Sequence, residues 1–325
     1  MKEFYKLIDA CRSEKVYIQT HNFPDPDAIA SAFGLQALFS HFGIPATLCY
    51  HGRIDKLSTR KMTELLHIRL VSYAELKDQM RPEDVIICVD SQKSGGNILD
   101  MAGNEIACID HHPTYTAVEY LYSDIRTVGS CATLIAEYFQ KLNVPMTAEV
   151  ATALLYGLKM DTAHFTRGVT ALDIDMFRYL FPKAEEHILT ELEKNTLEFA
   201  DLKAYGSAIE NIRVYDKTGI AAIPFACPDS LIALVADFIL SLEEVEIAIL
   251  YSYREKEIKF SVRSENPDIH AGELTNTALK GLGNGGGHAE MAGGSIGMEN
   301  ISRLGAYQDD SIRDLFLDAL EKLSA

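Results

Sequence analysis

The segment His21-Asn-Phe-Pro-Asp25-Pro-Asp27 places one imidazole and two carboxylates directly after an apolar run. A helix cap alone would use Asp25, with Pro26 at the first helical position. The histidine and the second aspartate exceed what a cap requires. An imidazole and carboxylates at a strand–helix junction form a mixed nitrogen and oxygen shell, which is typical of a divalent metal.

Three further polar clusters follow apolar runs: Asp90 after VIICV, Asp110-His111-His112 after EIACI, and Asp161 after LLYGLKM. Asp90 or Asp161 alone would be an ordinary turn or cap residue. Asp90 has two oxygens, however, and could bridge two metals. Adjacent side chains on extended backbone point in opposite directions. One histidine of the pair could therefore bind a metal and the other face a substrate, while Asp110 orients a histidine.

The second half contains a glycine-rich segment that ends in a histidine, Gly283-Asn-Gly-Gly-Gly-His288. Successive glycine amides can form an anion-binding nest, and glycine lets a substrate approach the main chain closely. Glycine alone would indicate a flexible surface loop. The nearby arginine could pair bidentately with a phosphate. We therefore predict phosphate binding by Arg263, Ser264, Gly285, Gly286, Gly287 and His288.

Short apolar runs alternate with helical patterns in the first half. Strands are predicted over 15–21, 46–52, 84–90 and 105–112, and helices over 27–43, 129–143, 147–160 and 170–180. This alternation predicts an α/β fold with a mainly parallel sheet and helices on both faces. Ligands of such sheets bind beyond the carboxyl ends of the strands, so the polar clusters should meet at one edge.

The pattern changes after a polar helix predicted over 186–204. Hairpin material is predicted over 208–225 and 245–264, and helices over 229–242 and 309–323. These elements, with the glycine-rich residues, predict a smaller mixed α/β domain. A length of 325 residues agrees with two domains.

The composition of the chain indicates which binding partners and which cellular compartment to expect. The net charge of −17 repels long duplex nucleic acid but leaves small anionic substrates compatible. The six cysteines are scattered without a CxxC pair, which indicates buried thiols and neither disulfides nor a zinc ribbon. The first residues lack the pattern of a signal peptide, and no apolar run reaches the length of a membrane span. We expect a cytoplasmic protein without membrane contact.

In combination, these motifs resemble those of the DHH phosphoesterase family, in the family's order. The second half resembles the DHH-associated domain with its GGGH signature, here Gly285 to His288. The chain is most similar to the short oligoribonuclease and 3′-phosphoadenosine 5′-phosphate phosphatase branch. Ala30 and Ala163 stand where the family usually has glycine, and both changes leave every ligand type intact. The Ser-Arg-Lys-Lys-Gln signature of the family's inorganic pyrophosphatases is missing from the sequence.

The resemblance implies two divalent cations, with manganese favoured over magnesium or cobalt. They would share a hydroxide that attacks phosphorus, with Asp110 and His112 as catalytic residues. It also implies a catalytic domain over 1–190, a linker helix over 191–205 and a substrate-binding domain over 206–325, with the active-site cleft between the domains. The implied metal ligands are His21, Asp25 and Asp90 for one cation, and Asp27, Asp90, His111 and Asp161 for the other.

The implied substrates are short single-stranded oligonucleotides or 3′-phosphoadenosine 5′-phosphate. Linear or cyclic dinucleotides and polyphosphate are alternatives within the same enzyme class. A degenerate nucleotide-binding module would have lost a ligand, and the sequence retains them all. A purely structural protein would explain none of the polar clusters. The sequence leaves the oligomeric state open and is compatible with a homodimer.

Overall fold

The computed structural model describes residues 2–54, 56–114, 116–194 and 197–324. The chain forms two compact units, Met1–Thr196 and Leu197–Ala325, and each is described here by itself. None of the helices in the described part of the chain combines the length and the apolar character needed to cross a bilayer.

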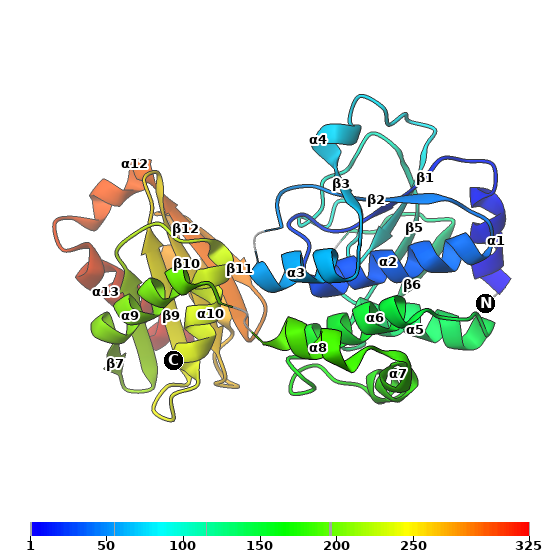
Figure 1. Ribbon diagram of the computed structural model, residues 1–325. Helices are drawn as coiled ribbons and strands as arrows, with labels where there is room; N and C mark the ends of the chain where they lie inside the picture. The colour runs from blue at the N-terminus through cyan, green and yellow to red at the C-terminus, as the bar shows by residue number, and fades with distance from the viewer. Residues whose placement is uncertain (1, 55, 115, 195–196, 325) are drawn as a thin grey trace. The chain divides into compact units, whose positions relative to one another are not determined.

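The first unit is built on a parallel sheet flanked by helices (Figure 1). The sheet has six strands in the order β3-β2-β1-β4-β5-β6, and every neighbouring pair is parallel. The predicted α/β class and parallel sheet are confirmed. Two strands beyond the four predicted ones, β3 and β6, lie at the edges. The strands are β1 (Val16–Gln19), β2 (Ala46–Tyr50), β3 (Leu70–Ser72), β4 (Val85–Val89), β5 (Asn104–Asp110) and β6 (Tyr122–Ile125).

Helices cover one face of this sheet in two layers. α2 (Pro26–His41) and α5 (Cys131–Leu142) pack on the strands, and α6 (Ala148–Asp161) packs on both helices. Alternate strand residues such as Ile18, Ile87 and Ile109 are fully buried in the core on this side. The remaining helices of the unit are α1 (Lys2–Cys11), α3 (Leu57–Leu65), α4 (Tyr73–Leu76), α7 (Ala171–Leu180), η1 (Phe181–Lys183) and α8 (Glu186–Glu193).

The opposite face of the sheet carries a smaller apolar cluster. Tyr17, Ile86 and Cys88 alternate along their strands with the residues of the larger core, and Leu76 of α4 packs with them. Both faces are therefore buried, which is why the central strands read as continuous apolar runs rather than as an alternating pattern.

The order of the strands reverses beside β1. The chain runs from β1 outward through β2 and β3, then returns to place β4 on the other side of β1. Ligands of open α/β sheets bind at such a switch point, beyond the carboxyl ends of the two strands. His21 follows β1 and Asp90 follows β4, so the fold brings both to this position.

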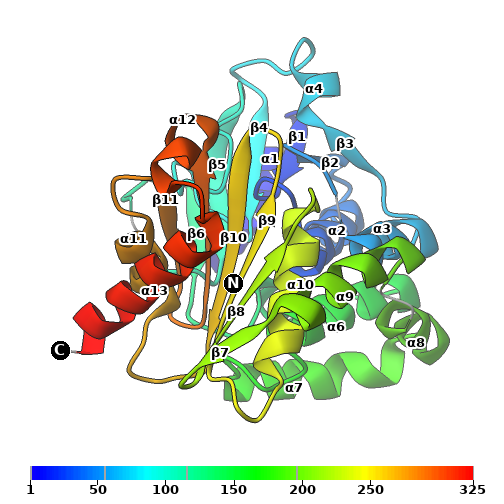
Figure 2. The same cartoon turned by 90° about the vertical axis from the view of Figure 1, so that its left-hand side faces the viewer.

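The second unit is a mixed six-stranded sheet in the order β11-β12-β10-β9-β8-β7. Helices α9 and α10 pack on one face, and α11 and α13 pack on the other (Figure 2). The strands are β7 (Arg213–Tyr215), β8 (Thr218–Ile223), β9 (Ile247–Tyr253), β10 (Glu257–Ser264), β11 (Asn284–Gly287) and β12 (Met291–Gly297). The helices are α9 (Leu202–Asn211), α10 (Asp229–Leu240), α11 (Ala271–Leu279), α12 (Met298–Ile301), η3 (Ser302–Leu304) and α13 (Gln308–Ser324).

The single polar helix predicted over 186–204 was wrong. α8 ends at Glu193, and α9 begins at Leu202 after the short 3-10 helix η2 (Phe199–Asp201). The reason lies in the apolar sides of the two helices. Leu192 of α8 is buried in the core of the first unit, whereas Ala208 of α9 is buried in the core of the second.

Candidate metal centre

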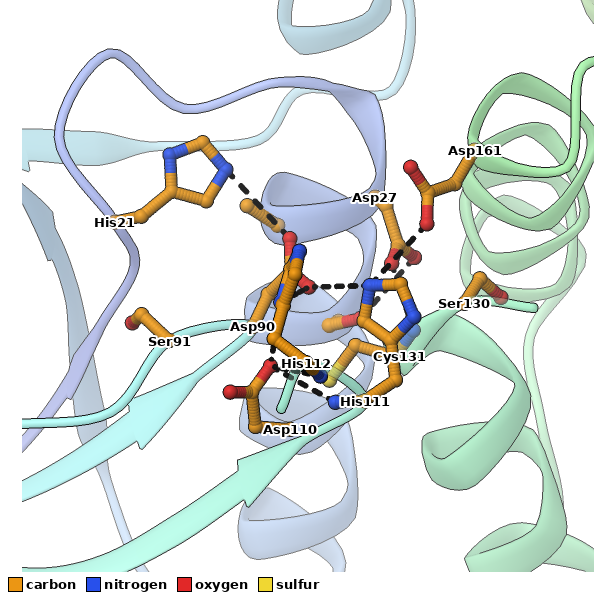
Figure 3. Close-up of polar contacts among 12 residues, drawn as sticks. His21, Asp27, Asp90, Ser91, Asp110, His111, His112, Ser130, Cys131 and Asp161 are labelled. Carbon is orange, nitrogen blue, oxygen red and sulfur yellow. Dashed lines mark hydrogen bonds and ion pairs between the residues drawn. The ribbon is translucent and has the colours of Figure 1, made fainter. Parts of the chain in front are cut away.

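The structure brings the six candidate metal ligands together at the carboxyl edge of the first sheet. Figure 3 labels all of them except Asp25. Three groups have ligand atoms within 4.8 Å of one another. They are His21 with Asp25 and Asp90, Asp27 with His111 and Asp161, and Asp90 with His111 and His112. The ligands come from the ends of β1, β4 and β5, from the start of α2 and from the last residue of α6.

The ring of His21 is oriented by main chain. Its Nδ1 lies 2.8 Å from the carbonyl oxygen of Asn22. A ring nitrogen facing a carbonyl must donate, so the Nε2 of the neutral ring carries the lone pair. That Nε2 lies 3.7 Å from Oδ1 of Asp25 and 3.6 Å from Oδ2 of Asp90. The lone pair therefore faces two carboxylates, an arrangement that calls for a cation.

His111 repeats this arrangement. Its Nδ1 lies 3.1 Å from the carbonyl oxygen of Val128. Its Nε2 lies 3.2 Å from Oδ1 of Asp90 and 3.2 Å from Oδ2 of Asp161. The two oxygens of Asp90 thus face different histidines, as a carboxylate shared between two cations would.

Two atoms at this point test whether a cation fits. Oδ1 of Asp90 and Nε2 of His111 are buried and make no hydrogen bond within the described part of the chain. Bonds of about 2.1 Å to a cation, at octahedral or tetrahedral angles, separate neighbouring ligand atoms by about 3.0–3.4 Å. The separations of 3.2 Å from Nε2 of His111 to Asp90 and Asp161 lie in that range, whereas those of 3.6 and 3.7 Å from Nε2 of His21 are wider. The donor set around His111 therefore fits a divalent cation.

The electrostatics of the cluster favour positive charge. Burial would lower the pKa of His21, but Asp25 and Asp90 outweigh it and raise the pKa to about 10. For His111, the adjacent carboxylate of Asp90, with the charges of Asp27 and Asp161, likewise overcomes burial and raises the pKa to about 11. Burial, with the charges of Asp25 and Asp90, raises the pKa of Asp161 to about 6. Protons thus accumulate where cations would otherwise neutralise the carboxylates.

The two aspartates of the first motif are also held by backbone amides. Asp25 caps α2, and its Oδ1 accepts the N–H groups of Asp27 and Ala28 at 3.0 and 3.1 Å. Asp27 is 1 % exposed and accepts the N–H groups of Cys131 and Ala132, at 2.7 and 2.9 Å, from the first turn of α5. Asp25 is therefore both a helix cap and a candidate ligand.

The pair Asp110 and His112 forms a second polar group beside the cluster. Oδ1 of Asp110 lies 2.9 Å from Nδ1 of His112, and Nε2 of Gln92 donates to Oδ2 at 2.8 Å. Burial would lower the pKa of His112, but its hydrogen bond to Asp110 raises it. Asp110 thus orients the ring, whose side chain is 36 % exposed and can reach a substrate. The sequence carried no signal for Gln92.

Strained backbone surrounds the candidate ligands. Phe23, Asp90 and Ala163 have φ angles of +56°, +56° and +46°, in the left-handed region that side chains rarely adopt. Such residues tend to cluster at functional sites. Ala163 also stands where the resemblance expects glycine, and its φ angle explains that preference. Ala30 is the other alanine that stands where the resemblance expects glycine. Its Cβ fits because it faces Gly157 of α6, which has no side chain.

In the second unit, the glycine-rich segment does not form the loop that a nest of amides would need. Asn284–Gly287 form the edge strand β11, paired with β12, rather than a loop. Ser264 also has another role: it is 2 % exposed, and its hydroxyl donates to the carbonyl of Ile269 at 2.8 Å, so it is unavailable to a substrate. His288 follows β11 and is exposed.

Arg263 and the glycines nevertheless share an open pocket of about 530 Å³. Arg263 and Lys259 line it from β10, Gly285 and Gly286 from β11, and Gly293 from β12. The guanidinium of Arg263 is held by Oδ1 of Asp237, 2.5 Å from its Nε. Lys259 was not predicted, because only the strand register places it beside the glycines.

An open α/β sheet with a histidine–aspartate cluster at its switch point is typical of metal-dependent hydrolases of phosphate esters. Residues 15–158 match the model of the DHH family, N-terminal domain, and residues 217–314 match the DHHA1 domain. The chain belongs to the DHH family of phosphoesterases.

Several proteins are similar to most of the chain. MJ1633 of Methanocaldococcus jannaschii is 29% identical over 281 residues, which are 86% of this chain and 57% of that protein. The bifunctional oligoribonuclease and PAP phosphatase NrnA of Thermus thermophilus is 25% identical over 86% of this chain and 84% of its own length. The cyclic-di-AMP phosphodiesterase PdeA of Listeria monocytogenes is 24% identical over 86% of this chain and 44% of its own. The chain thus spans about half the length of some of its relatives.

Among solved structures, an exopolyphosphatase-related protein from Bacteroides fragilis aligns with a TM-score of 0.79 and 19% identity. The alignment covers 100% of this chain and 97% of that one. At this identity, the likeness supports the fold.

Proposed function

We propose that the chain hydrolyses phosphate ester bonds of short oligonucleotides or of 3′-phosphoadenosine 5′-phosphate. The observation that carries the proposal is the position of Asp90. One of its oxygens faces Nε2 of His21 and the other faces Nε2 of His111. Two divalent cations held in this way would polarise a phosphoryl oxygen and would supply a nucleophile at neutral pH.

The residues divide into two ligand sets. His21, Asp25 and Asp90 would hold one cation, and Asp90 would also serve the second together with three further ligands. Those ligands are Asp27, His111 and Asp161, whose ligand atoms lie within 4.8 Å of one another. The imidazole nitrogens favour manganese over magnesium, which prefers an all-oxygen shell with several waters.

His112 acts on the substrate rather than on a cation. Its Nδ1 is bound to Asp110, so its Nε2 is left to contact a phosphoryl oxygen or to protonate the leaving oxygen. The hydrogen bond to Asp110 raises the pKa of His112, which favours the protonated ring, in which Nε2 donates. Asp110 and Gln92 keep the ring in this orientation.

The pocket of the second unit supplies a place for a substrate phosphate. Lys259 and Arg263 offer positive charge, which pairs well with phosphate. A Cβ on Gly286 would meet no atom within 4 Å, and one on Gly293 would meet only a carbonyl at 3.8 Å. Packing therefore does not demand these two glycines, and their bare backbone lets a ligand approach closely. A net charge of −17 disfavours long backbone contacts, which supports short substrates.

The proposal is tested by freeing the protein of metal, restoring Mn²⁺ and supplying a panel of phosphate esters. We expect hydrolysis of labelled di- to pentanucleotides or of 3′-phosphoadenosine 5′-phosphate, and none with chelator present. Asp90→Asn should abolish turnover, whereas Asp175→Asn, an exposed aspartate on α7, should not. If the protein cleaved only cyclic di-AMP or polyphosphate, the proposed substrate class would be wrong. Full activity in chelator would refute the metal centre.

The role of the pocket is tested separately with Arg263→Ala. This change should raise KM for nucleotides far more than KM for a small aryl phosphodiester, which carries no second phosphate for the pocket to bind. Arg213→Ala is the control, because Arg213 is exposed on β7 at the opposite edge of the same sheet. An equal rise in KM for both substrates would remove Arg263 from substrate binding.

A further inference from the structure

The first unit contains a buried carboxylate that is not among the candidate ligands. Asp173 of α7 is 0% exposed. Its Oδ2 accepts the N–H of Gly129 at 2.9 Å and both the N–H and the hydroxyl of Thr170, at 2.7 and 2.6 Å. Its Oδ1 accepts the hydroxyl of Thr133 at 2.6 Å. Removing an isolated carboxylate from water is costly, and these four donors offset that cost.

The segment bound by Asp173 also holds two candidate metal ligands. The carbonyl of Val128, next to Gly129, accepts Nδ1 of His111. The N–H groups of Cys131 and Ala132, two and three residues further on, hold both oxygens of Asp27. Figure 3 shows Cys131 and Ser130 at the start of α5, beside Asp27 and His111.

A second set of bonds stiffens the same segment. Ser130 caps α5 by accepting the N–H of Thr133 at 3.1 Å, and the two hydroxyls lie 3.0 Å apart. The hydroxyl of Thr133 is the one that donates to Asp173. The cap of α5 and the carboxylate of α7 therefore form one buried network.

The approach of Asp173 to the segment is close enough to exclude a side chain. A Cβ on Gly129 would lie 2.9 Å from Cγ of Asp173 and 2.6 Å from Cγ2 of Thr162. Thr162 directly follows Asp161, the last ligand of the second set. The network of Asp173, Thr133 and Ser130 thus contacts the segment that holds Asp27 and His111. It also contacts Thr162, the neighbour of Asp161.

We propose that Asp173 is a positioning residue for one half of the metal centre. Its carboxylate fixes residues 128–132, so that Val128 and the first amides of α5 orient His111 and Asp27. This inference rests on the proposed function, because it assumes that the cluster binds two cations. The network touches the ligand set of Asp27, His111 and Asp161 and leaves the set of His21 and Asp25 to other supports. Loss of Asp173 should therefore weaken one cation site selectively.

The test measures Mn²⁺ binding to the metal-free protein by calorimetry and by the electron paramagnetic resonance signal of free Mn²⁺. Asp173→Asn keeps the volume of the side chain but turns an amide NH₂ toward groups that themselves donate. Substitution of a residue that supports a metal ligand typically lowers the metal affinity 10–100-fold. We expect a loss of about that size at one site and a change below about twofold at the other. Excess Mn²⁺ should restore part of kcat.

Two control variants separate positioning from general destabilisation. Asp175→Asn lies two residues away on the same helix and is exposed, so both sites should stay unchanged. Thr133→Val removes one donor to Asp173 while keeping the carboxylate, and tests the network if Asp173→Asn does not fold. The matched control for Thr133→Val is Thr152→Val. Thr152 is a buried threonine on α6, and its hydroxyl accepts the N–H of Glu185 at 2.8 Å. Thr133→Val should weaken one Mn²⁺ site, and Thr152→Val should weaken neither.

Wild-type binding at both sites in the Asp173 and Thr133 variants would overturn the positioning role. So would an equal loss at both sites that Thr152→Val reproduces, because general loosening of the unit would then explain it. A wild-type protein that binds no Mn²⁺ would overturn the metal centre itself, and that failure is visible before any variant is made.

Discussion

Gly157 of α6 offers a direct test of how the helices hold Asp27. A Cβ at this position would lie 2.9 Å from Cβ of Ala30, 3.1 Å from Cα of Asp27 and 3.2 Å from Oδ1 of Asp27. Normal carbon–carbon contacts are about 3.5–4.0 Å, so Gly157→Ala must separate α2 from α6 or push Asp27 aside. Overpacking of this kind costs about 1–3 kcal/mol, and alanine returns about 1 kcal/mol of helix propensity. We expect a net loss of up to about 2 kcal/mol in stability.

The displacement of Asp27 should also lower Mn²⁺ affinity, which distinguishes this position from other tight glycines. Gly34→Ala is the matched control, since its Cβ would lie 2.8 Å from Ile135 and 3.0 Å from Leu154, between helices of the same core but away from the ligands. Urea unfolding of the metal-free protein and Mn²⁺ titration are measured for both variants. Both should lose stability, and Gly157→Ala alone should lose affinity. Equal affinity in the two variants would refute the reasoning.

Three further outcomes follow from the geometry of the centre. Because the pKa values of His21 and His111 are raised to about 10 and about 11, both rings are protonated at pH 7 without metal. Cation binding should release about two protons at pH 7, and the affinity should rise with pH up to about pH 11, where His111 loses its proton. Calorimetry in buffers of different ionisation enthalpy measures both quantities. Ala163→Gly should raise the midpoint of urea unfolding. It relieves about 1–2 kcal/mol of left-handed backbone strain in the folded state. The greater flexibility of glycine in the unfolded chain offsets about 0.5–1 kcal/mol of that gain. His112→Ala should abolish hydrolysis and leave Mn²⁺ titration unchanged, whereas loss of Mn²⁺ binding would make His112 a ligand.

Local patterns were enough to predict the central part of the first unit. The four inner strands are continuous apolar runs, and the polar residues that end them are the candidate ligands. Because all six strands are parallel, the carboxyl ends of those runs must meet at one edge. Sequence position alone therefore indicated that His21, Asp90 and His111 converge.

Other features depend on contacts that no local pattern records. The edge strands β3 and β6 are short and only partly buried, so they lack the apolar signal of the inner strands. Asn284–Gly287 reads as a loop from its composition, and only pairing with β12 makes it a strand. Gln92 and Asp173 act on partners 18 and 44 residues away, which a sequence without known register cannot reveal.

Main-chain groups orient most of the candidate ligands. Carbonyls hold the rings of His21 and His111, and amides hold the carboxylates of Asp25 and Asp27. A main-chain carbonyl cannot be removed by substitution, and an amide N–H is removed only by proline, so the geometry of the centre depends on the path of the backbone. The residues that fix this path should therefore be nearly as sensitive as the ligands themselves. They are Gly129 and Gly157, where a side chain would collide, and Asp90, whose left-handed backbone directs its two oxygens toward different histidines.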